Sequence, residues 1–404
     1  MKVLIINSVC GIGSTGRIVS DLYTMLRSQR HEVKIAYALG EATGVLEEDL
    51  VRINNKFGYY IHNILARLTD KAGFYSKYQT FNLLKFISDY KPDIIHLHTL
   101  HGFYIHVGVL FNYLKKSNVP VVWTLHDCWS FTGHCVYYSY SKCNKWKAGG
   151  CNNCPIIHNY PKSIWRDNSE SNFYRKKSLF TSIPQMWITT PSNWLAKEVE
   201  QSFLGKYPIR AIYNGIDLQI FHPIKSDIKS KLGIATDKKM LLSVAMGWSK
   251  RKGLDDLIEL HKRLDIAKYQ MVIVGLSKLQ ISELPVGIIG MGRTQSITEL
   301  VELYSAADLF VNTSYEETMG MVTAEALACG TPAIVYDQTA VPEVVDETSG
   351  LIVHAGNIDE LKNKIECALS INRSNARKRA ELFERVQQYE KYYSLYSFIF
   401  SSIH

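Results

Sequence analysis

The chain has 404 residues, of which 46% are hydrophobic and 21% are charged, and its formal net charge is +8. This length predicts two domains of roughly 150–200 residues each. No apolar run approaches the ~20 residues that cross a bilayer, the first residues resemble a strand more than a signal peptide, and basic residues form no dense stripe for nucleic acid. We therefore expect a cytoplasmic, globular enzyme that handles anionic substrates.

The first predicted strand, KVLIIN (2–7), leads into the loop CGIGSTGRI. Gly11, Gly13 and Gly16 have the spacing GxGxxG, which occurs where a Rossmann turn binds dinucleotide phosphates. NAD-binding domains also carry an acidic residue at the end of the second strand, about 20 residues further on. The second predicted strand, EVKIAYA (32–38), is followed by leucine and glycine instead. An NAD oxidoreductase is therefore the weakest of the functional hypotheses.

Residues 57–87, FGYYIHNILARLTDKAGFYSKYQTFNLLKFI, mix aromatic, leucine and basic side chains. Such a segment commonly packs helices onto a sheet, but aromatic and basic residues on one amphipathic helix also bind membrane interfaces. Two interpretations stay open here. The segment either only covers the sheet, or it also contacts a membrane or receives a lipid-linked acceptor.

Two buried-strand patterns, PDIIHLH (92–98) and PVVWTLH (120–126), bring histidines to strand ends. Ligands of open α/β sheets bind beyond the carboxyl ends of the strands, so polar side chains at these ends are site candidates. His126 is the stronger candidate, with a buried structural imidazole as the alternative. We expect His96 and His98 to be structural.

The segment 128–160 is rich in cysteine, and four of its cysteines have the spacing C-x7-C-x7-C-x2-C. In a cytosolic chain, clustered cysteines favour a metal over disulfides. Four thiolates complete the tetrahedral shell of a structural Zn²⁺. We therefore expect a structural zinc ion, with free thiols or a redox pair as alternatives. The predicted ligands are Cys135, Cys143, Cys151 and Cys154.

After QMWITTPS (185–192) and the join IRAIYNGID (209–217), the alternation of strands and helices begins again. KMLLSVAMG, YQMVIVG, VGIIGM, ADLFVNTS and TPAIVYD supply a second set of predicted strands. Two consecutive sets predict an α/β protein with two Rossmann-like, doubly wound domains facing a cleft. The predicted parts are a first domain 1–207, a second domain 208–384 and a C-terminal helix 385–404 that packs on the first domain.

The segment SYEETMGMVTAEALACGTPAIVYD (314–337) carries Glu317 and Glu325 with the spacing E-x7-E. On one helix they would lie ~12 Å apart, farther than the ~5–9.5 Å between paired glycosidase carboxylates. We therefore expect Glu317 on the loop after a strand and Glu325 on the next helix, whose apolar sequence argues against a purely solvated surface. Free N–H groups at the helix start would face a phosphate, and both carboxylates would accept hydrogen bonds from sugar hydroxyls. The N–H groups expected there belong to Met319, Gly320 and Met321.

These segments together resemble retaining GT-B glycosyltransferases, in particular the large glycosyltransferase family 4. The resemblance covers most of the chain through the glycine loop, PDIIHLH, PVVWTLHD, TPSNWL, YNGIDLQIFHP, KRKGLDDLI and EETMGMVTAEALACGTPAIV. It implies transfer of a hexosyl group, with retention and without a catalytic metal, from a UDP-, GDP- or dTDP-sugar to a hydroxyl. The more specific resemblance, to enzymes of bacterial capsular and exopolysaccharide synthesis, implies a polyprenyl-diphosphate-linked saccharide acceptor and a location at the inner face of the cytoplasmic membrane.

The resemblance also implies roles for single residues. Glu317 would contact the transferred sugar, and Glu325 would bind the nucleotide ribose. Lys252, in SKRKGLDDLI, would neutralise the donor diphosphate and assist departure of the leaving group. His126 would hydrogen-bond the donor sugar or its transition state and would not act as a nucleophile. The remaining implied site residues are Arg251 beside Lys252, Gly13, Gly16 and Arg17 near the donor diphosphate, and Asp127 on the acceptor side.

The chain departs from the family pattern at one place. The arginine that usually follows the strand before KG is missing from SVAMGWSKRKG, where Met246, Gly247 and Trp248 stand. Arg251 is the candidate substitute. The departure leaves a non-catalytic nucleotide-sugar or glycan-binding scaffold as an alternative. A nucleotide-sugar epimerase on the same fold is the other alternative, although the E-x7-E motif and the cysteine-rich segment argue against it.

Overall fold

A computed structural model describes residues 1–402 and divides the chain into two compact units. Unit 1 contains Met1–Tyr213 and the C-terminal segment that starts at Gln388, and unit 2 contains Asn214–Gln387. The boundaries expected from the sequence were 207/208 and 384/385. The last two residues of the predicted helix 385–404 lie outside the described part of the chain.

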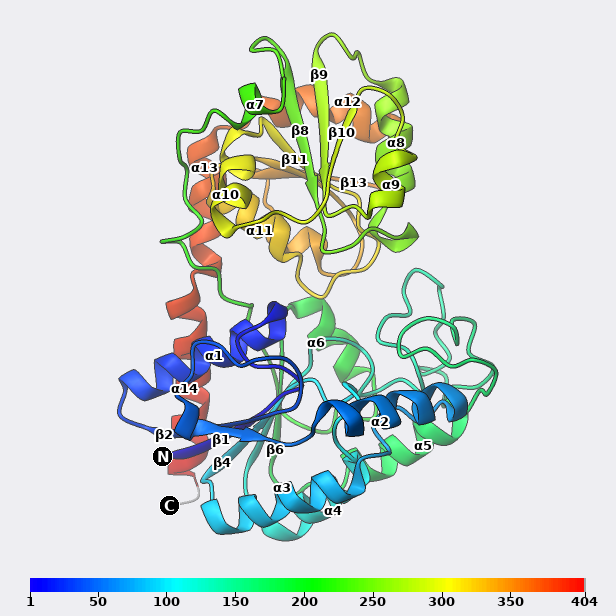
Figure 1. Cartoon of the computed structure of the whole chain (residues 1–404), viewed down its shortest axis with the longest axis vertical. Coiled ribbons are helices and arrows are strands. Elements are labelled where there is room, and N and C mark those ends of the chain that lie inside the picture. The colour runs from blue at the N-terminus through cyan, green and yellow to red at the C-terminus, as the bar shows by residue number, and fades with distance from the viewer. Residues whose placement is uncertain (403–404) are drawn as a thin grey trace. The chain divides into compact units, whose positions relative to one another are not determined.

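Unit 1 is built on a parallel sheet whose described strands have the order β3-β2-β1-β4-β5-β6-β7. Figure 1 labels four of them, β1, β2, β4 and β6. The strand order reverses between β1 and β4, which is the switch point where ligands of such sheets bind. The central strands β4 and β5 are buried throughout, and this explains their continuous apolar sequences. The strands are β1 Lys2–Ile6, β2 Glu32–Tyr37, β3 Leu50–Arg52, β4 Ile94–Leu97, β5 Val121–Thr124, β6 Met186–Thr190 and β7 Ile209–Ala211.

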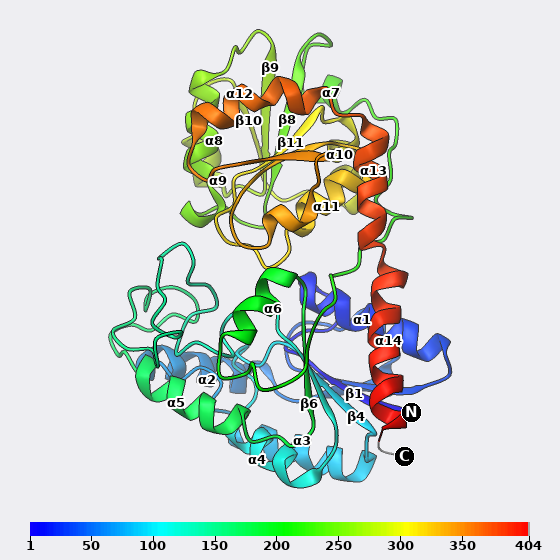
Figure 2. The ribbon, with the colours of Figure 1, turned by 180° about the vertical axis from the view of Figure 1, so that it is seen from behind.

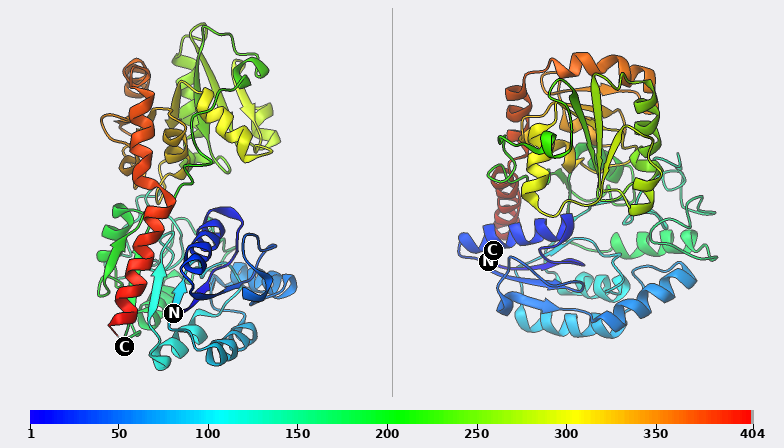
Figure 3. Two further views of the ribbon diagram at one scale, coloured as in Figure 1. Left: turned by 90° about the vertical axis from the view of Figure 1, so that its left-hand side faces the viewer. Right: turned by 45° about the horizontal axis from the view of Figure 1, so that its top comes forward.

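Helices cover both faces of this sheet. Alternate residues of β1 point to opposite faces, so Val3 belongs to one buried cluster and Leu4 to the other. The cluster with Val3 includes α1 and α14, and Figure 3 shows α14 in red along the strands of unit 1. The cluster with Leu4 includes α3, α4 and α5. The helices of unit 1 are α1 Gly13–Ser28, α2 Lys56–Thr69, α3 Lys77–Tyr90, α4 Val107–Ser117, α5 Ser169–Phe180 and α6 Asn193–Glu200.

The C-terminal helix α14, Arg385–Ser401, packs on unit 1 from Gln388 onward, as the sequence predicts. Its Tyr396 hydroxyl lies 2.6 Å from His96 Nδ1, below the sheet's central strands. The preceding helix α13 ends at Ala380, before α14 begins at Arg385 (Figure 2). The reason is a backbone pairing, because the N–H of Ile216 donates to the carbonyl of Phe383 at 2.8 Å.

Unit 2 contains a second parallel sheet, whose described strands have the order β10-β9-β8-β11-β12-β13. Helices α8 and α12 cover one of its faces through buried leucine and isoleucine side chains. The strands are β8 Lys239–Val244, β9 Tyr269–Val274, β10 Ile288–Met291, β11 Leu309–Asn312, β12 Ala333–Tyr336 and β13 Gly350–Val353. The helices are α7 Ile228–Lys231, α8 Leu254–Arg263, α9 Lys278–Ser282, α10 Ile297–Ala306, α11 Met321–Ala328, α12 Ile358–Leu369 and α13 Arg373–Ala380.

Three strands were not predicted from the sequence. They are β3, β7 and β13, and each forms an edge of its sheet. An edge strand pairs on one side only and is commonly short, so it carries little periodic pattern. Among the described residues, no helix combines the length and apolar character that spanning a bilayer requires.

Candidate functional site

In unit 2, the loop after β11 brings two of the predicted site residues into contact. The Lys252 ammonium donates a hydrogen bond to the Glu317 carboxylate. The two side chains are 15% and 16% exposed, so the ion pair is accessible from one side only. Lys252 lies in a 3₁₀ turn after β8, and Glu317 lies between β11 and α11, so the pair sits at the switch point of the second sheet.

The backbone conformation after Lys252 requires a glycine at position 253. Its φ is +74°, and a Cβ there would lie 2.2 Å from the carbonyl oxygen of Thr313. The Thr313 hydroxyl in turn donates to the Gly253 carbonyl at 3.0 Å. The loops after β8 and β11 therefore pack backbone against backbone, and this holds Lys252 against Glu317.

A third loop supports Glu317 from the other side. The Glu317 N–H donates to the Thr339 hydroxyl at 3.0 Å, and the Ala340 N–H donates to the Glu317 carbonyl at 3.3 Å. Loops after β8, β11 and β12 thus converge on Glu317, where Lys252 contacts the carboxylate and the Thr339 loop contacts the main chain. Sequence reasoning did not identify Thr339, because no local pattern marks a hydroxyl that only folding brings to Glu317.

At Met246 and just after it, where the family pattern has an arginine, this chain has no cationic side chain. The Met246 side chain is 80% exposed at the end of β8. Arg251 donates from Nη1 to the carbonyl of Glu316 at 3.3 Å, so its guanidinium lies beside the loop that carries Glu317. The structure therefore brings two cationic side chains, Arg251 and Lys252, to this loop.

The helix α11 starts directly after this loop. Gly320 is its N-cap, with φ +89°, and no side chain caps the helix. The first N–H groups, at the positive end of the helix dipole, are therefore not bound by a capping side chain. Glu317 lies on the loop and Glu325 on the helix, as predicted, and the Tyr304 hydroxyl donates to Glu325 Oε2 at 3.0 Å. The Met319 side chain is buried, so this residue can face a ligand only with its main chain.

In unit 1, the glycine loop forms the start of α1. Gly16 is buried, and a Cβ there would lie 3.1 Å from Val9 Cγ2, so the turn packs tightly against the helix. Gly13 has open space in front of it and Arg17 is exposed. The Asn7 side-chain oxygen accepts from the Thr99 N–H at 3.2 Å, which ties the loops after β1 and β4 together.

Two histidines from neighbouring strand ends form a pair. His98 Nδ1 lies 2.9 Å from His126 Nε2, and the rings stack. Burial lowers the pKa of His126 to about 4, against a smaller raising effect of Asp127. Burial also lowers the pKa of His98 well below its usual value. His126 is therefore a neutral imidazole near pH 7, and it lines a small cavity together with His98, His101 and Asp127.

Asp127 is held by a second histidine. Its Oδ2 lies 2.7 Å from His101 Nε2, and its Oδ1 accepts from the Trp129 N–H at 2.9 Å. Burial alone would raise the pKa of Asp127, but the His101 imidazole and the Trp129 N–H outweigh burial and lower it. His101 was not singled out from the sequence, although HLHTLHGF shows its histidine repeat.

The cysteine-rich segment is ordered by an aromatic cluster. In the described part of the chain, no regular helix or strand lies between β5 and α5. Phe131, Tyr138 and Trp146 are buried in the core of unit 1. The ring centroids of Phe131 and Trp146 lie 4.8 Å apart, and those of Tyr138 and Trp146 lie 5.2 Å apart.

The four predicted zinc ligands are free thiols that lie near one another. A hydrogen bond between Cys135 and Cys154 lowers the pKa of Cys154 to about 7 and raises that of Cys135. The Gly133 N–H lies 3.1 Å from Cys151 Sγ. Within residues 1–402, however, no three His, Cys, Asp or Glu side chains are arranged to hold a metal ion. The zinc site, including Cys143, stays a prediction.

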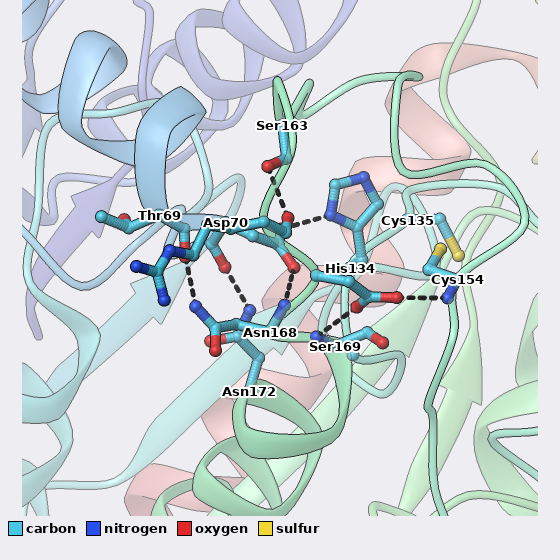
Figure 4. Close-up of polar contacts among 12 residues, drawn as sticks. Thr69, Asp70, His134, Cys135, Cys154, Ser163, Asn168, Ser169 and Asn172 are labelled. Carbon is cyan, nitrogen blue, oxygen red and sulfur yellow. Dashed lines mark hydrogen bonds and ion pairs between the residues drawn. The ribbon is translucent and has the colours of Figure 1, made fainter.

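Figure 4 shows how this segment is anchored to the end of α2. The buried Asp70 carboxylate accepts hydrogen bonds from His134 Nδ1 and from the Asn168 N–H. The Asp167 carboxylate accepts from the Cys154 N–H at 2.5 Å and from the Ser169 N–H at 2.8 Å. The two carboxylates, Asp70 and Asp167, thus add hydrogen bonds to the aromatic cluster in holding this segment.

Two family descriptions match the chain. Residues 15–220 match "Glycosyltransferase Family 4", and residues 224–385 match "Glycosyl transferases group 1". A curated relative is the putative colanic acid biosynthesis glycosyl transferase WcaC of Escherichia coli K12, which is 25% identical over 294 residues. That alignment covers 67% of this chain and 66% of WcaC. A relative from Methanocaldococcus jannaschii, described as an uncharacterized glycosyltransferase, is covered over 50% of its length.

Solved structures share the fold over nearly the whole chain. Sucrose-phosphate synthase from Thermosynechococcus elongatus is 18% identical, with a TM-score of 0.71 and 99% of both chains covered. HepE from Anabaena, solved in complex with UDP-glucose, is 18% identical, with a TM-score of 0.68 and coverage of 98% of this chain and 99% of HepE. With two Rossmann-like units of this fold and a family 4 match over half its length, the chain belongs to the GT-B glycosyltransferases of family 4.

Proposed function

We propose that this glycosyltransferase moves a hexosyl group from a nucleotide-sugar donor to a hydroxyl of a lipid-linked saccharide, with retention. The observation that carries the proposal is the Lys252–Glu317 pair beside the open start of α11. A sugar diphosphate needs cations and N–H groups for its phosphates and a hydrogen-bond acceptor for its hydroxyls. This loop cluster offers all three kinds of group.

The relatives support the substrate classes. HepE was solved with UDP-glucose, and WcaC is described as a transferase of colanic acid biosynthesis. We therefore propose a nucleotide sugar as the donor, with a UDP-sugar the first to test before GDP- and dTDP-sugars. We propose a saccharide of surface polysaccharide synthesis as the acceptor.

In the proposed donor complex, the diphosphate replaces Glu317 as the partner of Lys252, and Arg251 adds the second positive charge. Glu317 then accepts hydrogen bonds from hydroxyls of the transferred sugar. Glu325, already held by Tyr304, accepts from the ribose hydroxyls. The main-chain N–H groups of Gly320 and Met321 complete the contact with the phosphates.

Unit 1 supplies the remaining proposed contacts. The open N-terminal turn at Gly13, with Gly16 and Arg17, offers N–H groups and one guanidinium to the donor diphosphate. The neutral His126 exchanges hydrogen bonds with the sugar. Asp127, oriented by His101, accepts a hydrogen bond from the acceptor hydroxyl.

The proposed reaction is an attack on the same face of the sugar that the nucleotide leaves. The bond between the anomeric carbon and the phosphate oxygen breaks as the bond to the acceptor oxygen forms. The proton of the acceptor hydroxyl moves to the departing phosphate oxygen. Lys252 stabilises the negative charge that develops on that phosphate.

The test is nucleotide release from UDP-, GDP- and dTDP-sugars with and without lipid-linked saccharides, together with NMR of the anomeric configuration of the product. We expect release only when an acceptor is present. Glu317→Gln should lower the rate at least ~100-fold, whereas Glu283→Gln, a substitution at an exposed carboxylate of unit 2, should leave it unchanged.

Other outcomes point to the two alternative functions. Nucleotide release or sugar rearrangement without an acceptor would indicate an epimerase. Tight nucleotide binding without turnover for any donor and acceptor would indicate a binding scaffold. An inverted product would contradict the retaining mechanism alone.

A further inference from the structure

The helix α2 shows an unusual distribution of side chains. Its buried positions are Gly58, His62 and Ala66, which are small or polar. A surface helix ordinarily turns its large apolar side chains toward the core and its polar ones toward solvent. Here the large apolar side chains are on the other side, and Phe57 is 74% exposed.

The exposed apolar residues of α2 form one stripe. Phe57, Tyr60, Ile61 and Ile64 have the spacing i, i+3, i+4 and i+7, which brings them to the same face of a helix. The neighbouring helix α3 adds two further exposed aromatics, Tyr78 and Phe81.

A loop extends this surface at the C-terminal end of α2. The Ile164 N–H donates to the carbonyl of Arg67 at 2.9 Å, so the segment Tyr160–Asp167 is docked against the helix end. Ile164 is exposed, and the Trp165 side chain is 67% exposed. Tryptophan and tyrosine are the side chains that concentrate at the boundary between lipid and water.

Positive charge predominates around the stripe, and Asp167 at the end of the docked loop is the exposed acidic neighbour. Lys56 and Arg67 stand at the two ends of the stripe, Lys77 starts α3, and Lys162 and Arg166 flank the exposed loop side chains, all of them exposed. Between residues 50 and 88 the sequence contains one acidic residue, Asp70, which is buried at the end of α2. Apolar side chains rimmed by lysine and arginine fit a surface of anionic lipid headgroups.

A chain of contacts connects this surface with the acceptor-side residues of unit 1. Asp127 contacts His101, and His101 Nδ1 lies 3.2 Å from the Tyr160 hydroxyl. Phe103 packs on Tyr160, with ring centroids 5.8 Å apart. Phe103 also packs on Tyr59 at 6.0 Å, in the helix that carries the stripe.

We propose that the α2 stripe, Phe57, Tyr60, Ile61 and Ile64, docks unit 1 on an anionic membrane surface and thereby presents the acceptor side of the enzyme to a lipid-linked substrate. The membrane contact stands on exposure and charge alone. The delivery of the acceptor also rests on the proposed function. The proposed contact crosses no bilayer, because α2 has 14 residues and no described helix is long and apolar enough to span one.

The experiment is co-sedimentation of the full-length protein with vesicles of phosphatidylcholine, with or without phosphatidylglycerol. We expect binding to the phosphatidylglycerol vesicles that weakens as salt is raised. The variant Phe57→Ser/Ile61→Ser/Ile64→Ser should lose at least ~10-fold in partition coefficient. A matched control in unit 2, Ile266→Ser/Leu279→Ser/Val286→Ser, also removes three exposed apolar side chains and should bind as wild type does.

A second measurement separates this proposal from the proposed function. The stripe variant should transfer sugar to a detergent-solubilised acceptor at the wild-type rate and to a vesicle-embedded acceptor at a reduced rate. If vesicle binding depends on the stripe but the protein transfers sugar to no acceptor, the result supports the docking surface and contradicts the proposed function. Equal vesicle binding by wild type and stripe variant would overturn the proposal. So would a dimer, seen by sedimentation velocity, that dissociates in the stripe variant.

Discussion

In unit 2, the Glu317 carboxylate accepts a hydrogen bond from the Lys252 ammonium. The position of Glu317 after a strand was predictable from the E-x7-E spacing, because a motif of this kind is local. Its contact with Lys252, 65 positions earlier, was not, because loops from β8 and β11 meet only when the sheet is formed. The same holds for His126, whose partner His98 comes from a different strand.

Gly253 gives a prediction about stability. Gly253→Ala adds a Cβ 2.2 Å from the Thr313 carbonyl at a φ of +74°, so we expect the free energy of unfolding of unit 2 to fall by about 2–4 kcal/mol. Gly233→Ala is the matched control, because its φ is +70° but no atom lies within 4 Å of the added Cβ. It should cost only about 1 kcal/mol. Urea unfolding of both variants checks the difference, and equal losses would contradict the role of Thr313.

The buried histidines of unit 1 give a prediction about pH. Burial lowers the pKa of His96 to about 3 and that of His126 to about 4, below the usual value of 6.5. The unfolded chain therefore binds protons first as the pH falls, so the contribution of these histidines to the free energy of unfolding is constant above about pH 7 and decreases below about pH 6.5. At about pH 5 each such histidine should cost roughly 1–2 kcal/mol.

Urea unfolding between neutral pH and about pH 5 measures this loss. His126→Asn should remove the contribution of this half-buried imidazole to the pH dependence of the free energy of unfolding. His222→Asn, at an exposed position, should leave the pH dependence as in wild type. The same pH dependence in wild type and His126→Asn would contradict the lowered pKa of His126.

Among the elements, the strands with an apolar run were predictable, including the edge strand β10, whereas the edge strands β3, β7 and β13 were not. A central parallel strand is buried on both faces and shows an apolar run, whereas β3, β7 and β13 have a partner on one side only. The separation of α13 from α14 had no local pattern either. It depends on the pairing of Phe383 with Ile216, which lies far away in sequence.

The cysteine-rich segment gives a prediction about metal content. Although no three ligand side chains are arranged for a metal ion within residues 1–402, the C-x7-C-x7-C-x2-C spacing predicts that the purified protein binds one zinc ion. Elemental analysis of protein purified without added chelator measures it. Cys151→Ser and Cys154→Ser should lose the zinc, whereas Cys367→Ser, an exposed cysteine of unit 2, should keep it. A metal-free protein in which Cys135 and Cys154 form a disulfide on oxidation would favour the redox pair.

At the scale of the whole molecule, the two units differ in how the chain builds them. Unit 2 is one continuous stretch, Asn214–Gln387, whereas unit 1 needs the return of α14 to cover one face of its sheet. Buried side chains of α14, such as Tyr392 and Leu395, share a core cluster with Val3 and Ile5 of β1. The C-terminal segment is therefore part of the first domain's core.

This construction predicts different behaviour of the separated units. Residues 214–387 expressed alone should fold cooperatively and bind a nucleoside diphosphate. Lys252→Met should weaken that binding about 10-fold or more, which calorimetry can measure. Residues 1–213 alone should expose the apolar face that α14 covers and should aggregate. A monomeric, fully folded 1–213 fragment would contradict the role assigned to α14.

The sequence by itself determined the two Rossmann-like sets of strands and helices, the loops that carry Lys252 and Glu317, and the family. These features are local, because they rest on periodicity and on short spacings between neighbours in the chain. Only the tertiary structure decided that Lys252 pairs with Glu317, that His101 orients Asp127, and that the apolar side of α2 faces outward. Each of these depends on contacts between segments that are far apart in the sequence, and no local sequence pattern predicts such contacts.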